Sequence, residues 1–166
     1  MRQIHEEIID ALSAASGGLS SPALRQRLSR RLSQPTLSRH LSVLRARGLV
    51  TVEGRARATR YHAVTRGELP ALRSRRLHER VASRLLRDPA LRASAAERLV
   101  MLREVNPHGQ VYHDRWAELL SGPLPNLLRM MTERSDLGDA MRKESPFTTL
   151  VSAGERREVF DRLRVA

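Results

Sequence analysis

The stretch RRLSQPTLSRHLSVLRARGLV, residues 30–50, carries the periodicity of an amphipathic helix. Ser33 is a typical N-cap residue, and Gly48 is a typical residue just after a helix end. Pro35 costs little in the first helical turn, because its missing N–H would have had no partner within the helix. The sequence therefore predicts a helix from about Gln34 to Arg47, buried along a stripe of leucines at i, i+4 and i+7: Leu37, Leu41 and Leu44.

The residues before this helix predict two more helices. Ile4, Ile8 and Leu12 recur every four residues, and the glycine pair at 17–18 ends that helix. Ser21 and Pro22 then form an expected N-cap with proline at the first helical position. A short helix follows, with Leu24 and Leu28 on one face and a break at about residues 29–32.

The residues after the helix predict a hairpin. The segments LVTVE, residues 49–53, and TRYHAV, residues 59–64, are rich in β-branched residues and tyrosine, which favours two short strands. Between them lies GRARA, a basic tip that contains a glycine. The expected order is helix, helix–turn–helix and a two-stranded hairpin.

Positive charge is concentrated in this part of the chain. The 166 residues carry a formal net charge of +12, and residues 25–60 hold ten arginines and one acid, Glu53. From Ala71 onward there are 18 basic and 13 acidic residues, which is close to an ordinary solvated mixture. A focused basic segment is the electrostatic pattern of a surface that binds a polyanion.

The segment LSQPTLSRHL, residues 32–41, resembles the recognition-helix region of bacterial winged helix-turn-helix repressors. LSVLRARGLVTVEGRARATRYHAV, residues 41–64, resembles the helix end and wing of the ArsR- and MarR-like families. The resemblance covers about residues 1–66. One difference is a stretch between Leu28 and Ser33 that is about two residues longer than the usual turn between the two helices.

The resemblance implies a DNA-binding surface. Gln34 can pair with adenine and Arg39 with guanine, small hydroxyls can donate to phosphates, and the arginines of the hairpin would contact phosphates or the minor groove. The expected DNA-binding residues are Ser33, Gln34, Pro35, Thr36, Ser38, Arg39, Ser42, Arg55, Arg57 and Arg60.

The rest of the chain predicts helices. TRGELP, residues 65–70, is the expected linker, and apolar residues recur with helical spacing beyond it. We therefore expect a mainly α chain in two domains: a winged helix-turn-helix domain over residues 1–66 with a small β-hairpin wing, and an all-helical domain for dimerisation or regulation over residues 70–166.

The helical half contains one distinctive stretch, VNPHGQVYHDRWAELLSGPL, residues 105–124. It holds the one tryptophan and one of the two tyrosines of the chain. One interpretation is core and dimer packing. The other is a regulatory pocket or partner surface built from Tyr112, His113, Arg115 and Trp116.

Other chemistry finds little support in the sequence. The chain has no cysteine, so it lacks thiolate zinc ligands, and the one local group of candidate metal ligands, His108, His113 and Asp114, has weak spacing. No motif indicates a nucleophile with its base, a phosphate-binding loop or paired carboxylates. We expect no enzyme activity, no cofactor and no metal. The absence of a signal peptide pattern and of a long apolar run favours a cytoplasmic protein without membrane association.

These observations predict a sequence-specific transcriptional regulator, a repressor by resemblance, that reads a near-palindromic operator on double-stranded DNA as a homodimer. Two alternatives stay open. The chain could be an antitoxin-like autorepressor whose helical domain binds a partner protein, or a non-specific architectural nucleic-acid-binding protein. A small-molecule effector for the helical domain is a further possibility.

Overall fold

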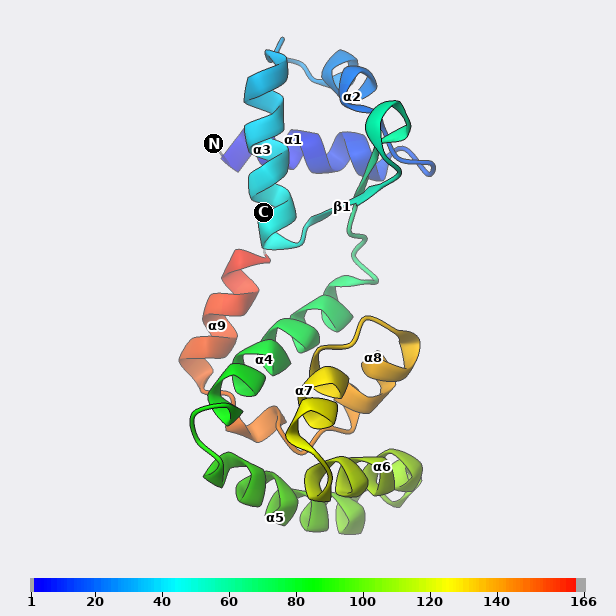
Figure 1. Ribbon diagram of the computed structural model, residues 1–166. Helices are drawn as coiled ribbons and strands as arrows, with labels where there is room; N and C mark the ends of the chain where they lie inside the picture. The colour runs from blue at the N-terminus through cyan, green and yellow to red at the C-terminus, as the bar shows by residue number, and fades with distance from the viewer. Residues whose placement is uncertain (1, 164–166) are drawn as a thin grey trace. The chain divides into compact units, whose positions relative to one another are not determined.

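A computed structural model describes residues 2–163 (Figure 1). They form two compact units. Unit 1 comprises residues 2–69 together with residues 161–163, and unit 2 comprises residues 70–160. The expected second domain was continuous from residue 70 to the C-terminus, whereas the structure groups the end of the last helix with unit 1.

Unit 1 places helices before a hairpin, in the predicted order. The described elements are α1 (Arg2–Ser13), α2 (Ser21–Arg27), α3 (Gln34–Arg47), β1 (Val50–Glu53), the 3-10 helix η1 (Ala56–Ala58) and β2 (Arg60–Ala63). The strands are antiparallel, and their register runs from Val50 opposite Ala63 to Glu53 opposite Arg60. Leu19 and Tyr61 exchange backbone hydrogen bonds of 3.0 and 2.9 Å, so β2 has a short third neighbour on its other side.

Side-chain caps define where α2 and α3 begin. Ser33 caps α3 as expected, and its hydroxyl accepts a hydrogen bond from the N–H of Thr36 at 3.2 Å. The cap of α2 is Ser20 instead of the expected Ser21, because Ser20 is the residue with extended backbone whose hydroxyl accepts from Ala23 N. Proline therefore lies at the second helical position in both helices.

The core of unit 1 is aliphatic. Leucine and isoleucine from all three helices meet residues at the start of β1, and burial of each such side chain contributes about 1.5–3 kcal/mol. The fully or nearly fully buried residues are Ile8, Ile9, Leu12, Leu19, Leu24, Leu28, Leu37, Leu41, Leu44, Leu49, Val50 and Leu163. The predicted leucine stripe of α3 is thus confirmed as its buried face.

Unit 2 is helical throughout its described residues. Its elements are α4 (Leu69–Leu85), α5 (Ala90–Val105), the 3-10 helix η2 (Pro107–Gly109), α6 (Gln110–Ser121), α7 (Leu124–Thr132), α8 (Asp136–Lys143), the 3-10 helix η3 (Thr148–Leu150) and α9 (Ala153–Arg162). Figure 1 shows α5 and α6 side by side. Ser152 and Glu155 form a reciprocal capping box before α9, with bonds of 2.8 and 3.2 Å.

The N-terminus of α4 uses part of the expected linker. The backbone N–H and hydroxyl of Thr65 both donate to Glu68 Oε2 at 2.7 Å. These bonds lower the pKa of Glu68 below its usual value, because they favour the ionised carboxylate. Residues 65–68 are therefore an ordered lead into the helix.

Aromatic packing anchors the core of unit 2. Trp116 on α6 is fully buried, and its ring meets Phe147 edge to face with centroids 5.6 Å apart. Its indole N–H donates to the carbonyl of Met141 at 2.8 Å, so the burial leaves no polar atom of Trp116 unpaired. The segment around Phe147 is consequently held against α6 and α8.

A buried arginine secures the turn between α7 and α8. Arg142 is 1% exposed, and its guanidinium donates to the carbonyl of Glu133 at 2.8 Å and to that of Met131 at 3.3 Å. The same guanidinium forms an ion pair with Asp139. These bonds satisfy carbonyls that the end of α7 leaves without helical partners.

His78 on α4 is buried in a neutral state. It is 2% exposed, and its Nδ1 lies 2.8 Å from the carbonyl of Ser74, which can only accept. Its Nε2 therefore accepts from the hydroxyl of Ser145 at 2.8 Å. Burial lowers the pKa of His78 to about 4; the bond to Ser74 opposes this shift, and Arg142 adds to it.

We expect the stability of the protein to fall between pH 7.5 and pH 5. The folded pKa of His78 lies below that of the unfolded chain, so the unfolded state takes up a proton first as the pH falls below about 6.5. The loss by pH 5 is about 2 kcal/mol. Urea unfolding of wild type, His78→Gln and the exposed control His108→Gln would measure it. His78→Gln should flatten the pH dependence, and an unchanged dependence would contradict the buried neutral state.

The fold class is confirmed: a mainly α chain with a two-stranded hairpin after a helix–turn–helix arrangement, followed by an all-helical region. None of the described helices has the length and apolar character needed to cross a membrane.

Candidate nucleic-acid interface

The N-terminus of helix α3 is capped by Ser33 and carries no carboxylate of its own. Its first turn contains no acidic residue, and Pro35 removes one N–H that would otherwise need a partner. The helix dipole makes this end electropositive, which favours a phosphate. At the other end, Gly48 adopts a left-handed conformation with φ of 78°, and Leu49 N bonds to Leu44 O at 2.9 Å. The helix thus ends where the chain turns into β1.

The outward face of α3 lies opposite its leucine stripe. With 100° between successive residues, Pro35, Arg39 and Ser42 lie on the side of the helix opposite Leu37, Leu41 and Leu44, together with Ala46. All three are exposed, as is Ser38. Within residues 2–163, the side chains of Ser38, Arg39 and Ser42 make no hydrogen bond or ion pair that would hold them on the protein surface. They are available to a ligand outside the domain.

Three other predicted contact residues already have partners. The hydroxyls of Ser33 and Thr36 lie 2.8 Å apart, and Thr36 is half-buried. Gln34 donates from Nε2 to the hydroxyl of Ser21 at 2.9 Å, across the turn from α3 to α2. These residues stabilise the arrangement of α2 and α3. A DNA contact by any of them would have to use a polar group that already forms a hydrogen bond within the protein.

The turn between α2 and α3 is long, as the sequence predicted. It spans residues 28–33. Arg25 Nε donates to the carbonyl of Leu32 at 2.8 Å, and the carboxylate of Glu7 accepts from the backbone N–H of Ser29. This bond lowers the pKa of Glu7. The extra residues are therefore tied to both α1 and α2.

The hairpin tip is a tight, basic turn. Gly54 has φ of 76°, and a Cβ at this position would lie 2.4 Å from the carbonyl of Ala58, so the turn requires glycine. Arg55, Arg57 and Arg60 are exposed, and none makes a hydrogen bond or ion pair within the described residues. Glu53, the nearby acid, lies instead 3.3 Å from His62 Nε2.

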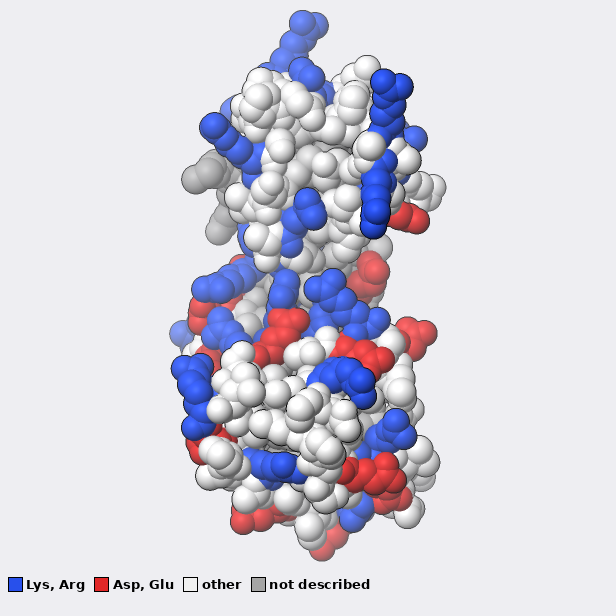
Figure 2. Space-filling view, in the orientation of Figure 1, with Lys and Arg blue, Asp and Glu red and all other residues white. Residues whose placement is uncertain are grey.

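Several basic side chains are scattered over the visible face of unit 1, which is otherwise mostly uncharged, and acidic ones are few there (Figure 2). In unit 2 the two signs are mixed. The difference agrees with the segmental charge in the sequence and locates the positive potential on the unit that carries α3 and the hairpin.

A histidine pair that sequence inspection missed joins α1 to α3. His5 Nε2 and His40 Nδ1 lie 3.0 Å apart, and the rings meet edge to face. Burial lowers the pKa of His5, and the charges on His40 and Arg47 lower it further. This contact between the two ring nitrogens connects α3 to α1. Residues separated by 35 positions give no local signal of such a pair.

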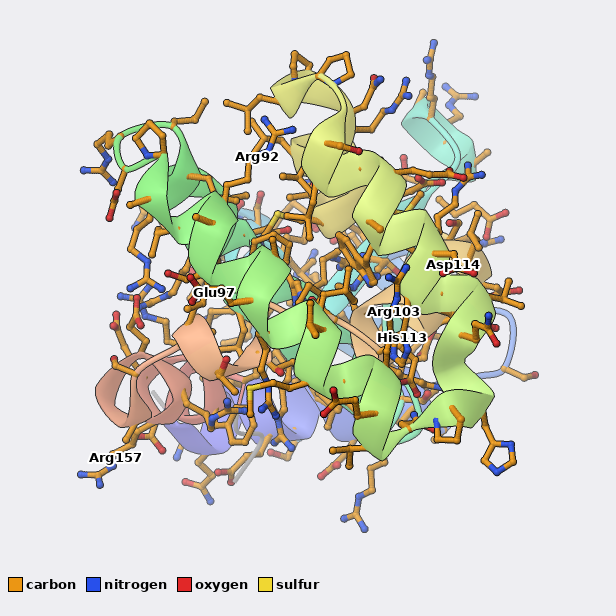
Figure 3. The ribbon with its side chains drawn as sticks, turned by 90° about the horizontal axis from the view of Figure 1, so that it is seen from below. Arg92, Glu97, Arg103, His113, Asp114 and Arg157 are labelled. Atoms are coloured by element: carbon orange, nitrogen blue, oxygen red, sulfur yellow. The ribbon has the colours of Figure 1, made fainter. Side chains whose placement is uncertain are left out.

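The four expected regulatory residues differ in their exposure, and two of them are core residues. His113 and Trp116 are fully buried, Tyr112 is half-buried and Arg115 is exposed. The ring of His113 lies inward, with Nε2 3.4 Å from Glu144 Oε2. Figure 3 shows that the outer surface nearby is formed instead by Arg103 on α5 and Asp114 on α6, which face one another in a 2.6 Å ion pair.

The described residues contain no group of three His, Cys, Asp or Glu side chains able to hold a metal ion. They do contain a serine and a histidine at hydrogen-bond distance, Ser145 and His78, which the sequence did not reveal. Ser145 is 2% exposed, and its hydroxyl oxygen also accepts from Phe147 N at 3.2 Å. This pair fixes a turn inside the core.

Comparison with known proteins supports the interface. Residues 7–53 match a family model described as a helix-turn-helix domain. The match runs from α1 to the end of β1, so it includes both helices of the motif and the first strand of the wing. No curated protein and no solved structure matches the chain. The helix-turn-helix match, together with the free basic face of unit 1, supports DNA-binding transcription regulation as the activity of this chain.

Proposed function

We propose that this protein is a sequence-specific transcriptional repressor that binds a near-palindromic operator as a homodimer. The observation that carries the proposal is the outward face of α3, where Arg39 and Ser42 are exposed and unpaired opposite the buried leucine stripe. A helix of this kind inserts its N-terminal half into the major groove, where side chains reach base edges. Repression is the activity of the proteins that the segment resembles.

The residues divide into two roles. Arg39 contacts a base, with Ser38 and Ser42 beside it, and Ser33, Gln34, Pro35 and Thr36 bring the N-terminus of α3 close to the DNA backbone. The arginines of the hairpin contact phosphates, which add affinity and carry no sequence information. Residues 1–66 are the DNA reader in this proposal, and residues 70–166 provide dimerisation and regulation.

Arg39→Ala should reduce specificity. A bidentate contact from arginine to guanine is worth about 1–3 kcal/mol of discrimination. In-cell mapping of binding sites first supplies the operator, and competition binding then compares operator with unrelated DNA. We expect affinity for the operator to fall by at least tenfold while affinity for unrelated DNA changes by a few fold. Equal affinity of wild type and variant for the operator would show that α3 does not read bases through Arg39.

Arg57→Ala should weaken all DNA to a similar extent. Loss of one phosphate contact lowers the slope of log affinity against log salt by about 1, with no change in preferred sequence. Titrations from 50 to 200 mM salt with operator and with unrelated DNA would measure the slope. A changed sequence preference at constant slope would assign base reading to the hairpin. Equal affinity of wild type for all sequences would support the architectural alternative.

Exposed apolar residues on unit 2 support the dimer proposal. Val100, Met101 and Val105 on α5 are 59%, 53% and 82% exposed, and Val111 at the start of α6 is 77% exposed. Met101 and Val105 are four residues apart and so lie on one helix face. Exposed apolar side chains that recur on one face are typical of a surface covered by a second chain. A symmetric pair of such faces would set the spacing of two half-sites.

Met101→Glu combined with Val105→Glu should give a monomer. Both positions are exposed, so the fold tolerates the change, whereas two charges cannot enter an apolar contact without a large desolvation penalty. Sedimentation of the full chain would give the mass, and Leu86→Glu at a 65% exposed position is the control. Operator affinity should fall together with dimerisation. A double variant that remains a dimer would place the interface elsewhere.

A further inference from the structure

Unit 2 contains a cavity of about 230 Å³ between α4, η3 and α9. Its walls are mostly apolar and include Leu77, Val151 and Phe160. Two arginines, Arg73 and Arg156, also line it, and no carboxylate does. An apolar cavity with a few convergent polar groups of one sign is the usual form of a small-molecule site.

The two guanidinium groups are available to an anion. Arg73 Nε is shielded from solvent and has no hydrogen-bond partner among the described residues. An unpaired N–H in this position costs free energy that an incoming acceptor would recover. The guanidinium carbon of Arg73 lies 4.9 Å from the ring centroid of Phe160, which also lines the cavity. Arg156 donates to the carbonyl of Thr148 at 3.2 Å.

The nearby charged residues do not neutralise the two arginines of the cavity. The carboxylates of Glu155 and Glu158 on α9 bind Arg84 at 3.6 Å and Arg80 at 2.8 Å. His78 lines the cavity but is neutral, because its two nitrogens are committed to Ser74 and Ser145. The cavity therefore combines positive charge at two arginines with walls that are otherwise uncharged.

We propose that this cavity binds a small carboxylic acid with an apolar body, of about the size of benzoate. The carboxylate would accept hydrogen bonds from Arg73 and Arg156, and the apolar body would lie against Leu77, Val151 and Phe160. The volume lies below the roughly 300–1,000 Å³ of sites for drug-sized ligands, which favours a single ring or a short branched chain. Used as an effector, such an acid would act through the function proposed above, but its binding does not depend on that function.

The test measures binding to the full chain without DNA, so a failure to bind DNA leaves its result unaffected. Ligand-observed NMR and thermal shift would compare benzoate and 3-methylbutanoate with the uncharged analogue benzamide. We expect saturable binding of both acids, an increase in Tm, and binding of benzamide at least tenfold weaker. Absence of saturable binding by both acids, or equal binding of benzamide, would overturn the proposal.

Variants locate the site. Arg73→Gln should lower the affinity for benzoate at least tenfold, and Arg156→Gln should lower it several fold. Arg157→Gln is the matched control. Arg157 lies next to Arg156 on α9, points away from the protein in Figure 3 and does not line the cavity. Arg156 is exposed, so its variant decides the question if Arg73→Gln does not fold. Wild-type affinity in both arginine variants, or an equal loss in Arg157→Gln, would overturn the assignment.

Discussion

The buried leucine stripe of α3 is the constraint on which the DNA-binding unit depends. Opposite sides of a helix cannot both face the core. Burial of Leu37, Leu41 and Leu44 therefore places Pro35, Arg39 and Ser42 on the outward side. The free energy for this comes from burial of the three leucines in the core of unit 1, because Ser38, Arg39 and Ser42 make no bond within the described residues that could orient the helix. The buried stripe thus fixes which face of α3 is outward, and the side chains of Ser38, Arg39 and Ser42 on that face remain available to a partner.

Polar contacts refine what the core establishes. Ser33 caps the N-terminus of α3 and so fixes the residue at which the helix begins. Gln34 donates a hydrogen bond to Ser21 and links that end of α3 to α2. The histidine pair His5–His40 joins α3 to α1 at a second place. Each bond is worth about 1 kcal/mol or less, so together they adjust the position of the helix without deciding which face it shows.

The core of unit 2 is packed with few aromatic residues. Trp116 and Phe147 are its large buried side chains. The buried guanidinium of Arg142 donates hydrogen bonds to carbonyls at the end of α7. The same packing leaves a cavity beside α4 where Arg73 lacks a partner for one N–H. Other shielded nitrogens of unit 2 also lack a hydrogen-bond partner, for example Nε of Arg75 and of Arg142, but Arg73 is the one of these three arginines that lines the cavity.

The sequence by itself determined the features that depend on residues near one another in the chain. The leucine period, the cap at Ser33, the glycines at 48 and 54 and the cluster of arginines predicted α3, the hairpin and the basic surface, because helix faces and turns are set within a few residues. It misplaced the cap of α2 by one residue, since adjacent serines at 20 and 21 differ only in backbone conformation. Tertiary structure alone decided that His113 and Trp116 are core residues and not a surface, that His5 meets His40, and that Arg73 and Arg156 share a cavity. His5 and His40 are 35 positions apart, and Trp116 and Met141 are 25 apart; only the packing of helices against one another brings such residues together.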